Sequence, residues 1–214
     1  MSSNRFSLWV TCSVFSLLCM PAFACYSGLI VIPTADMVPE KTYSIEYQTD
    51  GTIPHYAADT YLINTEAGIT DRFEAGVDYD LDKEADTRVL FNGKFLLRAA
   101  DEKLPAVAVG GCEIGDKLNG KFYLVATQSF DLARGHVGVQ RVDSTNSWFV
   151  GADKAIDDKL SVTADYTSGD DNSSSLGASY KLTDTTSVMA GTIFPNAGGD
   201  ARFTVHFVLT GLLK

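Results

Sequence analysis

The sequence lacks several features that define common classes of protein. After residue 25 it has no apolar run of the roughly 18 residues that a membrane-spanning helix needs. Its 4 cysteines in 214 residues are too few for a scaffold held by disulfides. Basic residues are also scarce: 17 Lys and Arg against 27 Asp and Glu give a net charge of −10, which argues against nucleic-acid binding. With 45% apolar residues the chain is nevertheless too hydrophobic to be mainly disordered.

Residues 1–24 have the organisation of a secretory signal peptide. Arg5 precedes an apolar run from Phe6 to Met20, and an A-x-A sequence at 22–24 is typical of a cleavage site. The run is short for a transmembrane helix and has no basic flank after it. We therefore expect the chain to be exported.

The predicted cleavage divides the chain into three parts. Residues 1–24 are the signal peptide, residues 25–40 form an N-terminal segment that acts as a plug or an extra strand, and residues 41–214 form the main domain. Cys25 would be the first mature residue. It could carry a lipid anchor, or form a disulfide with Cys112 in an oxidising compartment.

The mature chain alternates apolar and polar residues with the period of two that is typical of β-strands. Phe73, Val77 and Tyr79, for example, alternate with polar or small residues. Clusters of Asp, Gly, Asn and Ser interrupt this pattern and indicate turns. The pattern predicts about twelve strands, over 41–49, 60–69, 73–80, 88–98, 105–112, 121–130, 135–142, 147–153, 159–167, 175–182, 187–194 and 201–213.

Alternation fits two architectures, a soluble β-sandwich and an outer-membrane barrel, which bury opposite faces. Longer polar connections after odd-numbered strands and tight turns after even-numbered ones favour the barrel. Aromatic residues on the apolar face near strand ends favour it too, at Tyr43, Tyr47, Phe73, Tyr79, Tyr166 and Phe203. We predict an all-β fold, an antiparallel up-and-down transmembrane β-barrel of about twelve strands, within a range of roughly 10 to 14.

Two stretches resemble known outer-membrane proteins. Residues Gly28 to Asp36, leading into Tyr43–Tyr47, resemble the opening of YjbH-like bacterial outer-membrane proteins. The hairpin at 70–79 looks like turns that are common in porin-like barrels. The resemblance implies an outer-membrane β-barrel with a link to exopolysaccharide export.

In a barrel, the polar face would line the lumen and carry charges of both signs. Cross-strand pairing would let these charges lie inside, either as a salt-bridge network or as a constriction that selects ions. The residues that we expect to line the lumen are Glu46, Glu66, Glu74, Asp78, Arg88, Lys94, Arg98, Asp165, Lys181, Arg202 and His206.

Evidence for other chemistry is thin. Carboxylates alternate along a strand end and loop, a pattern that a weak Ca²⁺ site would explain, at Asp78, Asp80, Asp82, Glu84 and Asp86. A solvated acidic loop explains the same pattern. The histidines at 55, 136 and 206 lie apart in the sequence, and no nucleophile or metal motif accompanies them. We therefore expect no catalytic residues and no cofactor.

The sequence thus predicts a porin-like passive channel with a charge-lined lumen, or a structural or export-accessory protein, in the outer membrane. Its expected partners are outer-membrane lipid and either small solutes or an exported polysaccharide, and the oligomeric state stays open. The alternative is a soluble or lipid-anchored periplasmic β-sheet binding protein, which would place the apolar faces in a core and the polar faces in water.

Overall fold

The computed structural model describes residues 28–54, 57–81, 89–115 and 120–213. The predicted signal peptide and Cys25 lie outside these residues. No helix long and apolar enough to cross a membrane is found among the residues that the model describes. Their regular secondary structure consists of strands, as the period-two alternation predicts.

Twelve strands form, each within a few residues of a predicted one. They are β1 (Thr42–Thr52), β2 (Ala57–Gly68), β3 (Phe73–Asp80), β4 (Val89–Arg98), β5 (Ala106–Ile114), β6 (Lys121–Ser129), β7 (Arg134–Val142), β8 (Thr145–Ala155), β9 (Leu160–Thr167), β10 (Ser173–Lys181), β11 (Thr186–Pro195) and β12 (Arg202–Leu212).

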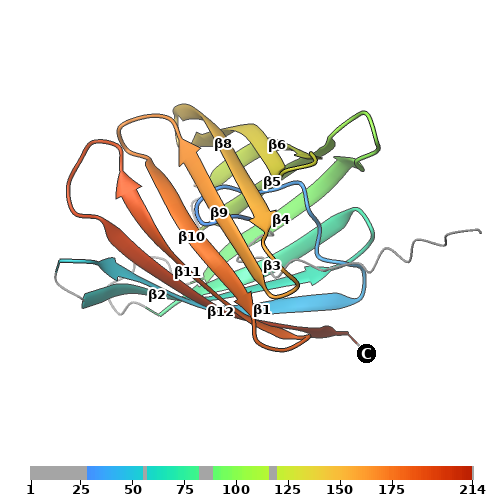
Figure 1. The fold of residues 1–214 in the computed structure, drawn as a ribbon, viewed down its shortest axis with the longest axis horizontal. Helices are drawn as coiled ribbons and strands as arrows, with labels where there is room; N and C mark the ends of the chain where they lie inside the picture. The colour runs from blue at the N-terminus through green and yellow to red at the C-terminus, as the bar shows by residue number, and fades with distance from the viewer. Residues whose placement is uncertain (1–27, 55–56, 82–88, 116–119, 214) are drawn as a thin grey trace, which may run out of the picture.

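The strands form one closed antiparallel barrel in which each strand pairs with its neighbours in sequence (Figure 1). Strands β1 and β12 close it, in a register that runs from Thr42 opposite Leu212 to Thr52 opposite Arg202. Closure leaves no free sheet edge, so the backbone hydrogen bonds of every strand are made within the barrel. The predicted up-and-down barrel is confirmed.

The barrel has two rims. The terminal rim holds the start of β1, the end of β12 and the turns after even-numbered strands, and the loop rim holds the other connections. The predicted difference in connection length is weaker than expected. On the loop rim β7 and β8 are joined by residues 143–144 alone, whereas 99–105 join β4 to β5 on the terminal rim.

Aspartates shape turns on the terminal rim. Asp157 Oδ1 accepts hydrogen bonds from the backbone N–H groups of Lys159 and Leu160 at 2.7 and 2.8 Å. These bonds stabilise the ionised carboxylate and lower the pKa of Asp157. Asp101 makes the same arrangement in the turn between β4 and β5. This is the physical reason why Asp-rich clusters predicted the turns.

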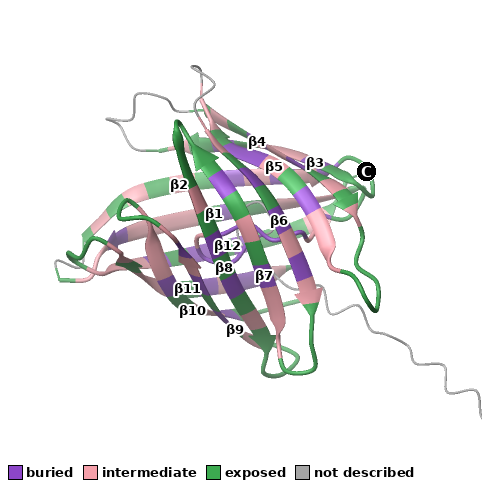
Figure 2. Ribbon diagram, turned by 90° about the horizontal axis from the view of Figure 1, so that it is seen from above, coloured by how far each residue is buried: buried purple, intermediate pink, exposed green. Residues whose placement is uncertain are grey.

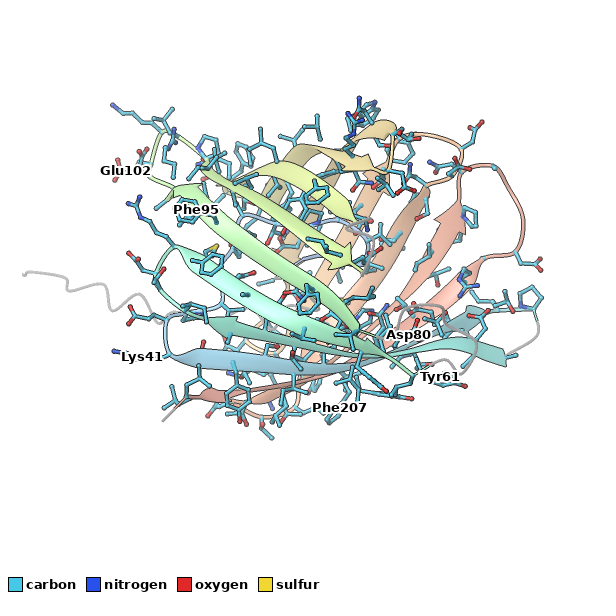
Figure 3. All side chains as sticks on the ribbon, turned by 180° about the vertical axis from the view of Figure 1, so that it is seen from behind. Lys41, Tyr61, Asp80, Phe95, Glu102 and Phe207 are labelled. Atoms are coloured by element: carbon cyan, nitrogen blue, oxygen red, sulfur yellow. The ribbon has the colours of Figure 1, made fainter. Side chains whose placement is uncertain are left out.

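The barrel is apolar outside and polar inside. Buried and exposed residues alternate along the strands (Figure 2). Phe91 and Leu176 on the outer face are 54% and 59% exposed, whereas Glu46 and Lys94 on the inner face are 1% and 2% exposed. Phe207 points away from the barrel (Figure 3). This polarity is the reverse of a soluble sandwich, because the face without contact to the rest of the chain is the apolar one.

Candidate functional site in the barrel interior

Residues 28–40, the inner segment, cross the inside of the barrel before the chain enters β1 (Figure 1). The segment begins with a tight turn in which Gly28 forms an antiparallel bridge with Pro33, and the Leu29 N–H donates to the Ile32 carbonyl at 2.9 Å. Side chains from opposite walls contact it. The interior of this barrel therefore contains a piece of the chain's own backbone.

The apolar side chains of the inner segment pack on one part of the wall. Leu29, Ile32 and Ala35 lie in a buried cluster with residues from β5, β6 and β8. The members from the wall are Ala108, Cys112, Tyr123, Val125 and Phe149. Cys112 has a free, buried thiol, and Cys25, considered as its disulfide partner, lies outside the described residues.

Glycines in the wall make room for these side chains. A Cβ atom at Gly151 of β8 would lie 2.6 Å from Ile32 Cδ1, and one at Gly177 or Gly191 would lie 2.6 Å from Ile30 Cδ1. Real Cβ atoms do not approach other carbons so closely. The wall is therefore shaped to accept the inner segment.

Polar side chains of the wall bind the backbone of the inner segment. Asp165 Oδ2 accepts hydrogen bonds from the N–H groups of Ile30 and Val31 at 3.0 and 3.3 Å, and Ser175 donates to Asp165 Oδ1 at 2.6 Å. Glu74 accepts from the Val38 N–H. Hydrogen bonds to ionised carboxylates are stronger than neutral ones, so these contacts hold the segment in place.

A charged network ties the middle of the segment to β6, β7 and β8. Arg134 contacts Asp36 Oδ1 through Nη1 at 3.0 Å and Asp153 Oδ1 through Nη2 at 3.1 Å. His136 Nε2 lies 2.7 Å from Asp153 Oδ1, and its Nδ1 lies 2.9 Å from Thr127 Oγ1. Alternation places its strand members on the polar face, but no sequence motif indicates that they form a network.

The Thr127, His136 and Asp153 side chains form a hydrogen-bonded chain like that of a nucleophile, base and acid. Thr127 Oγ1, however, accepts the Ala35 N–H at 2.9 Å and is covered by the inner segment. Thr127 is 5% exposed and His136 is 2% exposed, so a substrate has no access to them. Their contacts position the inner segment.

On the wall formed by β12 and β1 to β4, polar side chains also contact one another. Lys94 Nζ lies 3.0 Å from Glu74 Oε1, with both side chains 1% exposed. Glu46 Oε1 accepts from Asn64 Nδ2 at 2.9 Å and lies 2.9 Å from His206 Nδ1. The first contact joins β3 to β4, and the contacts of Glu46 join β1 to β2 and, across the closure of the barrel, to β12.

Seven of the predicted lumen residues are buried on the inner face: Glu46, Glu66, Glu74, Asp78, Lys94, Asp165 and His206. Three others, Arg98, Lys181 and Arg202, lie at strand ends near the rims and are only partly buried. Lys181 pairs with Asp184 in a turn, and Arg202 pairs with Asp59. Arg88 lies outside the described residues.

The carboxylates considered for Ca²⁺ do not form one site in the part of the chain that the structure describes. Asp78 is buried in the interior and accepts from Asn92 Nδ2 at 2.9 Å. Asp82, Glu84 and Asp86 lie outside the described residues. Among residues 28–54, 57–81, 89–115 and 120–213, no group of three or more His, Cys, Asp or Glu side chains is arranged to hold a metal ion.

A cleft opens at the terminal rim and reaches the inner segment. It has a volume of about 410 Å³. Turn residues line it together with inward-facing Thr163, Ser179 and Met189, and Gly28 and Leu29 also form part of its lining. Farther in, side chains such as Lys94 and Glu74 are closed to solvent. The interior is thus accessible at the rim and filled at the level of the segment.

The chain is similar to solved outer-membrane barrels. It matches the KdgM porin with a TM-score of 0.57 and 11% identity, over 78% of this chain and 98% of that chain. The KdgM porin in complex with disordered oligogalacturonate gives a TM-score of 0.59 at 11% identity, over 78% and 98%. The Acinetobacter baumannii outer membrane protein Omp33 gives 0.52 at 12%, over 79% and 98%.

The search of family models and the search of curated proteins find no match. The YjbH-like resemblance of residues 28–47 is therefore not supported. The apolar run that carried it has a local explanation in this structure, because Leu29, Ile30 and Ile32 pack inside the barrel. By its strand order, its closure and its likeness to these solved structures, the chain has the fold of the porin-like outer-membrane β-barrels.

Proposed function

We propose that this protein is an outer-membrane channel for small polar solutes. The observation that carries the proposal is the reversed polarity of a closed barrel, with large apolar side chains exposed outside and charged ones buried inside. The apolar outer surface fits a lipid environment, and a path for polar solutes needs a polar interior. The porin fold of the solved structures that the chain matches supports this function.

The inner segment acts as the plug of this channel. It is bound by Asp165, Thr127, Arg134 and Glu74, and it fills the space beside β5 to β11. Solutes pass when the segment shifts, and its hydrogen bonds then set how often the channel opens. The KdgM porin has been solved with oligogalacturonate. We propose small solutes or short polar oligomers as the cargo of this channel.

The soluble or lipid-anchored binding protein is the weaker alternative. It would leave Phe91, Leu176 and Val137 in water, at 54%, 59% and 57% exposure, over the whole circumference of the barrel. Apolar patches of that extent mark a membrane or a protein interface. A structural or export-accessory role fits the same barrel, and conductance separates it from the channel.

The first test is fractionation of the outer membrane followed by gel mobility with and without boiling. A folded barrel resists detergent until heated, so we expect a mobility shift in the membrane fraction. Recovery in the soluble periplasmic fraction with no shift would contradict the membrane location.

The second test locks the plug. The Ala35 N–H lies 2.9 Å from Thr127 Oγ1, so Ala35→Cys with Thr127→Cys, in a Cys25→Ala/Cys112→Ala background, is designed to form a disulfide between segment and wall. In planar bilayers we expect conductance under reducing conditions and its loss on oxidation. The Cys25→Ala/Cys112→Ala protein is the control and should not respond to the reductant. Equal conductance in both redox states would contradict the plug, and silence of every variant would contradict the channel.

A further inference from the structure

Hydroxyl groups are concentrated on the wall of the cleft at the terminal rim. Ser161 and Thr163 of β9 and Ser179 of β10 line it from the inner face of the barrel. Ser161 lies opposite Ser179 in the register of β9 and β10, and Ser179 lies opposite Met189 of β11. The three hydroxyl groups make no hydrogen bond with any residue that the structure describes. Their capacity to donate and to accept is therefore available to a ligand.

The hydroxyl of Thr163 is buried as well as unsatisfied. Thr163 is 8% exposed, and its Oγ1 has no hydrogen-bond partner among the described residues. Its cross-strand neighbour in β10 is Gly177, which has no side chain. Its neighbour in β8 is Asp153, whose carboxylate already binds Arg134 and His136. A buried hydroxyl without a partner is unfavourable, so a ligand that forms a hydrogen bond with it gains affinity.

The cleft also offers apolar contacts. Leu29 of the inner segment and Met189 of β11 line it, and each is 4% exposed. The volume of about 410 Å³ lies within the range of roughly 300–1,000 Å³ that is usual for small-molecule sites. A sugar-like ring carries hydroxyl groups at its edge and C–H groups on its faces. It therefore matches a cleft in which hydroxyl and apolar side chains converge.

The charges around the cleft balance one another. Four aspartates and four lysines or arginines contribute to its lining. Arg134 binds Asp153, Asp157 accepts two backbone N–H groups of its own turn, and Lys181 pairs with Asp184. Neither an anion nor a cation meets a surplus of the opposite charge here. The balance favours a neutral ligand.

We propose that the cleft at the terminal rim binds a neutral polyhydroxylated solute of the size of a monosaccharide, through the hydroxyl groups of Ser161, Thr163 and Ser179. Gly28 and Leu29 form part of the lining, so the bound solute also contacts the inner segment. The binding site goes beyond the proposed channel function and does not require conduction.

The test is a saturation-transfer NMR titration of the full mature protein, folded in an amine-oxide detergent because glycoside detergents would compete. The probes are D-glucose, its carboxylate analogue D-glucuronate and its ammonium analogue D-glucosamine. We expect glucose to bind at least about threefold more tightly than either charged probe.

Variants locate the site. Thr163→Val keeps the shape and removes the hydroxyl, and it should raise the Kd for glucose by about three- to tenfold, the effect of one hydrogen bond. Ser161→Ala with Ser179→Ala should raise it by about tenfold or more. Thr145→Val makes the same change at an exposed position on the loop rim and is the matched control, with no change in Kd expected.

Heat-modifiable gel mobility separates binding from folding. Thr163→Val removes a hydroxyl that has no partner, so the midpoint of its mobility shift should not fall. A weaker affinity together with a lower midpoint would assign the hydroxyl to folding and overturn its role in binding. No binding of glucose, tighter binding of a charged probe, or an equal Kd in wild type and Thr163→Val would overturn the site. Glucose binding without conductance would overturn the channel and leave the site, whereas conductance without glucose binding would do the reverse.

Discussion

The two halves of the barrel interior are filled in different ways. In the packed half, formed by β5 to β11, the inner segment supplies apolar side chains to a dry cluster and backbone N–H groups to acids of the wall. In the polar half, formed by β12 and β1 to β4, charged and amide side chains contact one another. Both halves come from strands with the same alternation.

Inside this closed barrel, a polar side chain that faces inward finds its partners in one of two ways. A carboxylate such as Asp165 is satisfied by a second piece of backbone, whereas Glu74 combines a lysine with a backbone N–H. The first arrangement ties the wall to the inner segment. The second also holds the Val38 end of that segment, but its Lys94–Glu74 ion pair joins strand to strand. We therefore expect the polar half to control barrel stability and the packed half to control opening.

The largest effect is expected at the buried ion pair of the polar half. Lys94→Met leaves Glu74 without its ammonium partner and should reduce the free energy of unfolding by about 3–5 kcal/mol. Denaturant unfolding of the detergent-folded barrel, followed by tryptophan fluorescence, measures it. Adding Glu74→Gln should restore more than half of the loss.

Lys181→Met is the control for this prediction. Lys181 pairs with Asp184 at an exposed turn, where a lost ion pair costs about 0–1 kcal/mol. A loss in Lys94→Met as small as that of the control would show that the polar half does not depend on its charge pairs.

The next prediction tests whether the outer faces of the two halves are equally apolar, so that the halves differ only in the barrel interior. Val77 of β3 and Val137 of β7 lie on the outer face, at 41% and 57% exposure. Arginine facing lipid near the midplane costs about 2–4 kcal/mol, so Val77→Arg and Val137→Arg should destabilise the barrel by similar amounts. Unfolding from lipid vesicles measures both. A cost in one half alone would mean that the apolar belt does not encircle the barrel.

A smaller and local effect is expected in the packed half. Asp165→Ala removes the acceptor of the Ile30 and Val31 N–H groups. We expect it to weaken binding of the inner segment to the barrel wall by about 1.5–3 kcal/mol. Hydrogen exchange at Ile30 and Val31 should accelerate by a factor of about 10 to 100, while exchange in the strands stays slow. Asp170→Ala, at an exposed loop position, should change neither. Global unfolding instead of local exchange would contradict a separable segment.

The smallest effect is a packing loss of one methyl group. Ile32 is fully buried beside Gly151, so Ile32→Val should lower the midpoint of the heat-induced mobility shift by an amount equivalent to about 0.5–1.5 kcal/mol. Ile45→Val on the outer face of β1 is the control and should have less effect, because lipid or detergent fills the space. Equal effects would indicate that the inner segment is loosely packed.

Sequence reasoning located the strands well, because a period of two is visible wherever one face is apolar and the other polar. All twelve strands lie within a few residues of their predicted positions, and Asp-rich clusters such as that around Asp157 mark the turns. Alternation also predicted that Glu46, Glu74 and Lys94 share the polar face, and these three residues are buried in the structure. The predicted contrast in connection length between the rims is present but weaker than expected, because residues 143–144 form a tight turn on the loop rim and residues 99–105 a longer connection on the terminal rim.

The sequence by itself determined the alternation, the number of strands and hence the class of fold, since these depend on neighbours along the chain. The tertiary structure decided which face meets lipid, that Asp165 binds Ile30 at a separation of 135 residues, and that Arg134 joins Asp36. These contacts arise only when barrel closure brings distant strands around residues 28–40. Local pattern fixes which way a side chain points, but the partner it finds there depends on how the whole barrel closes.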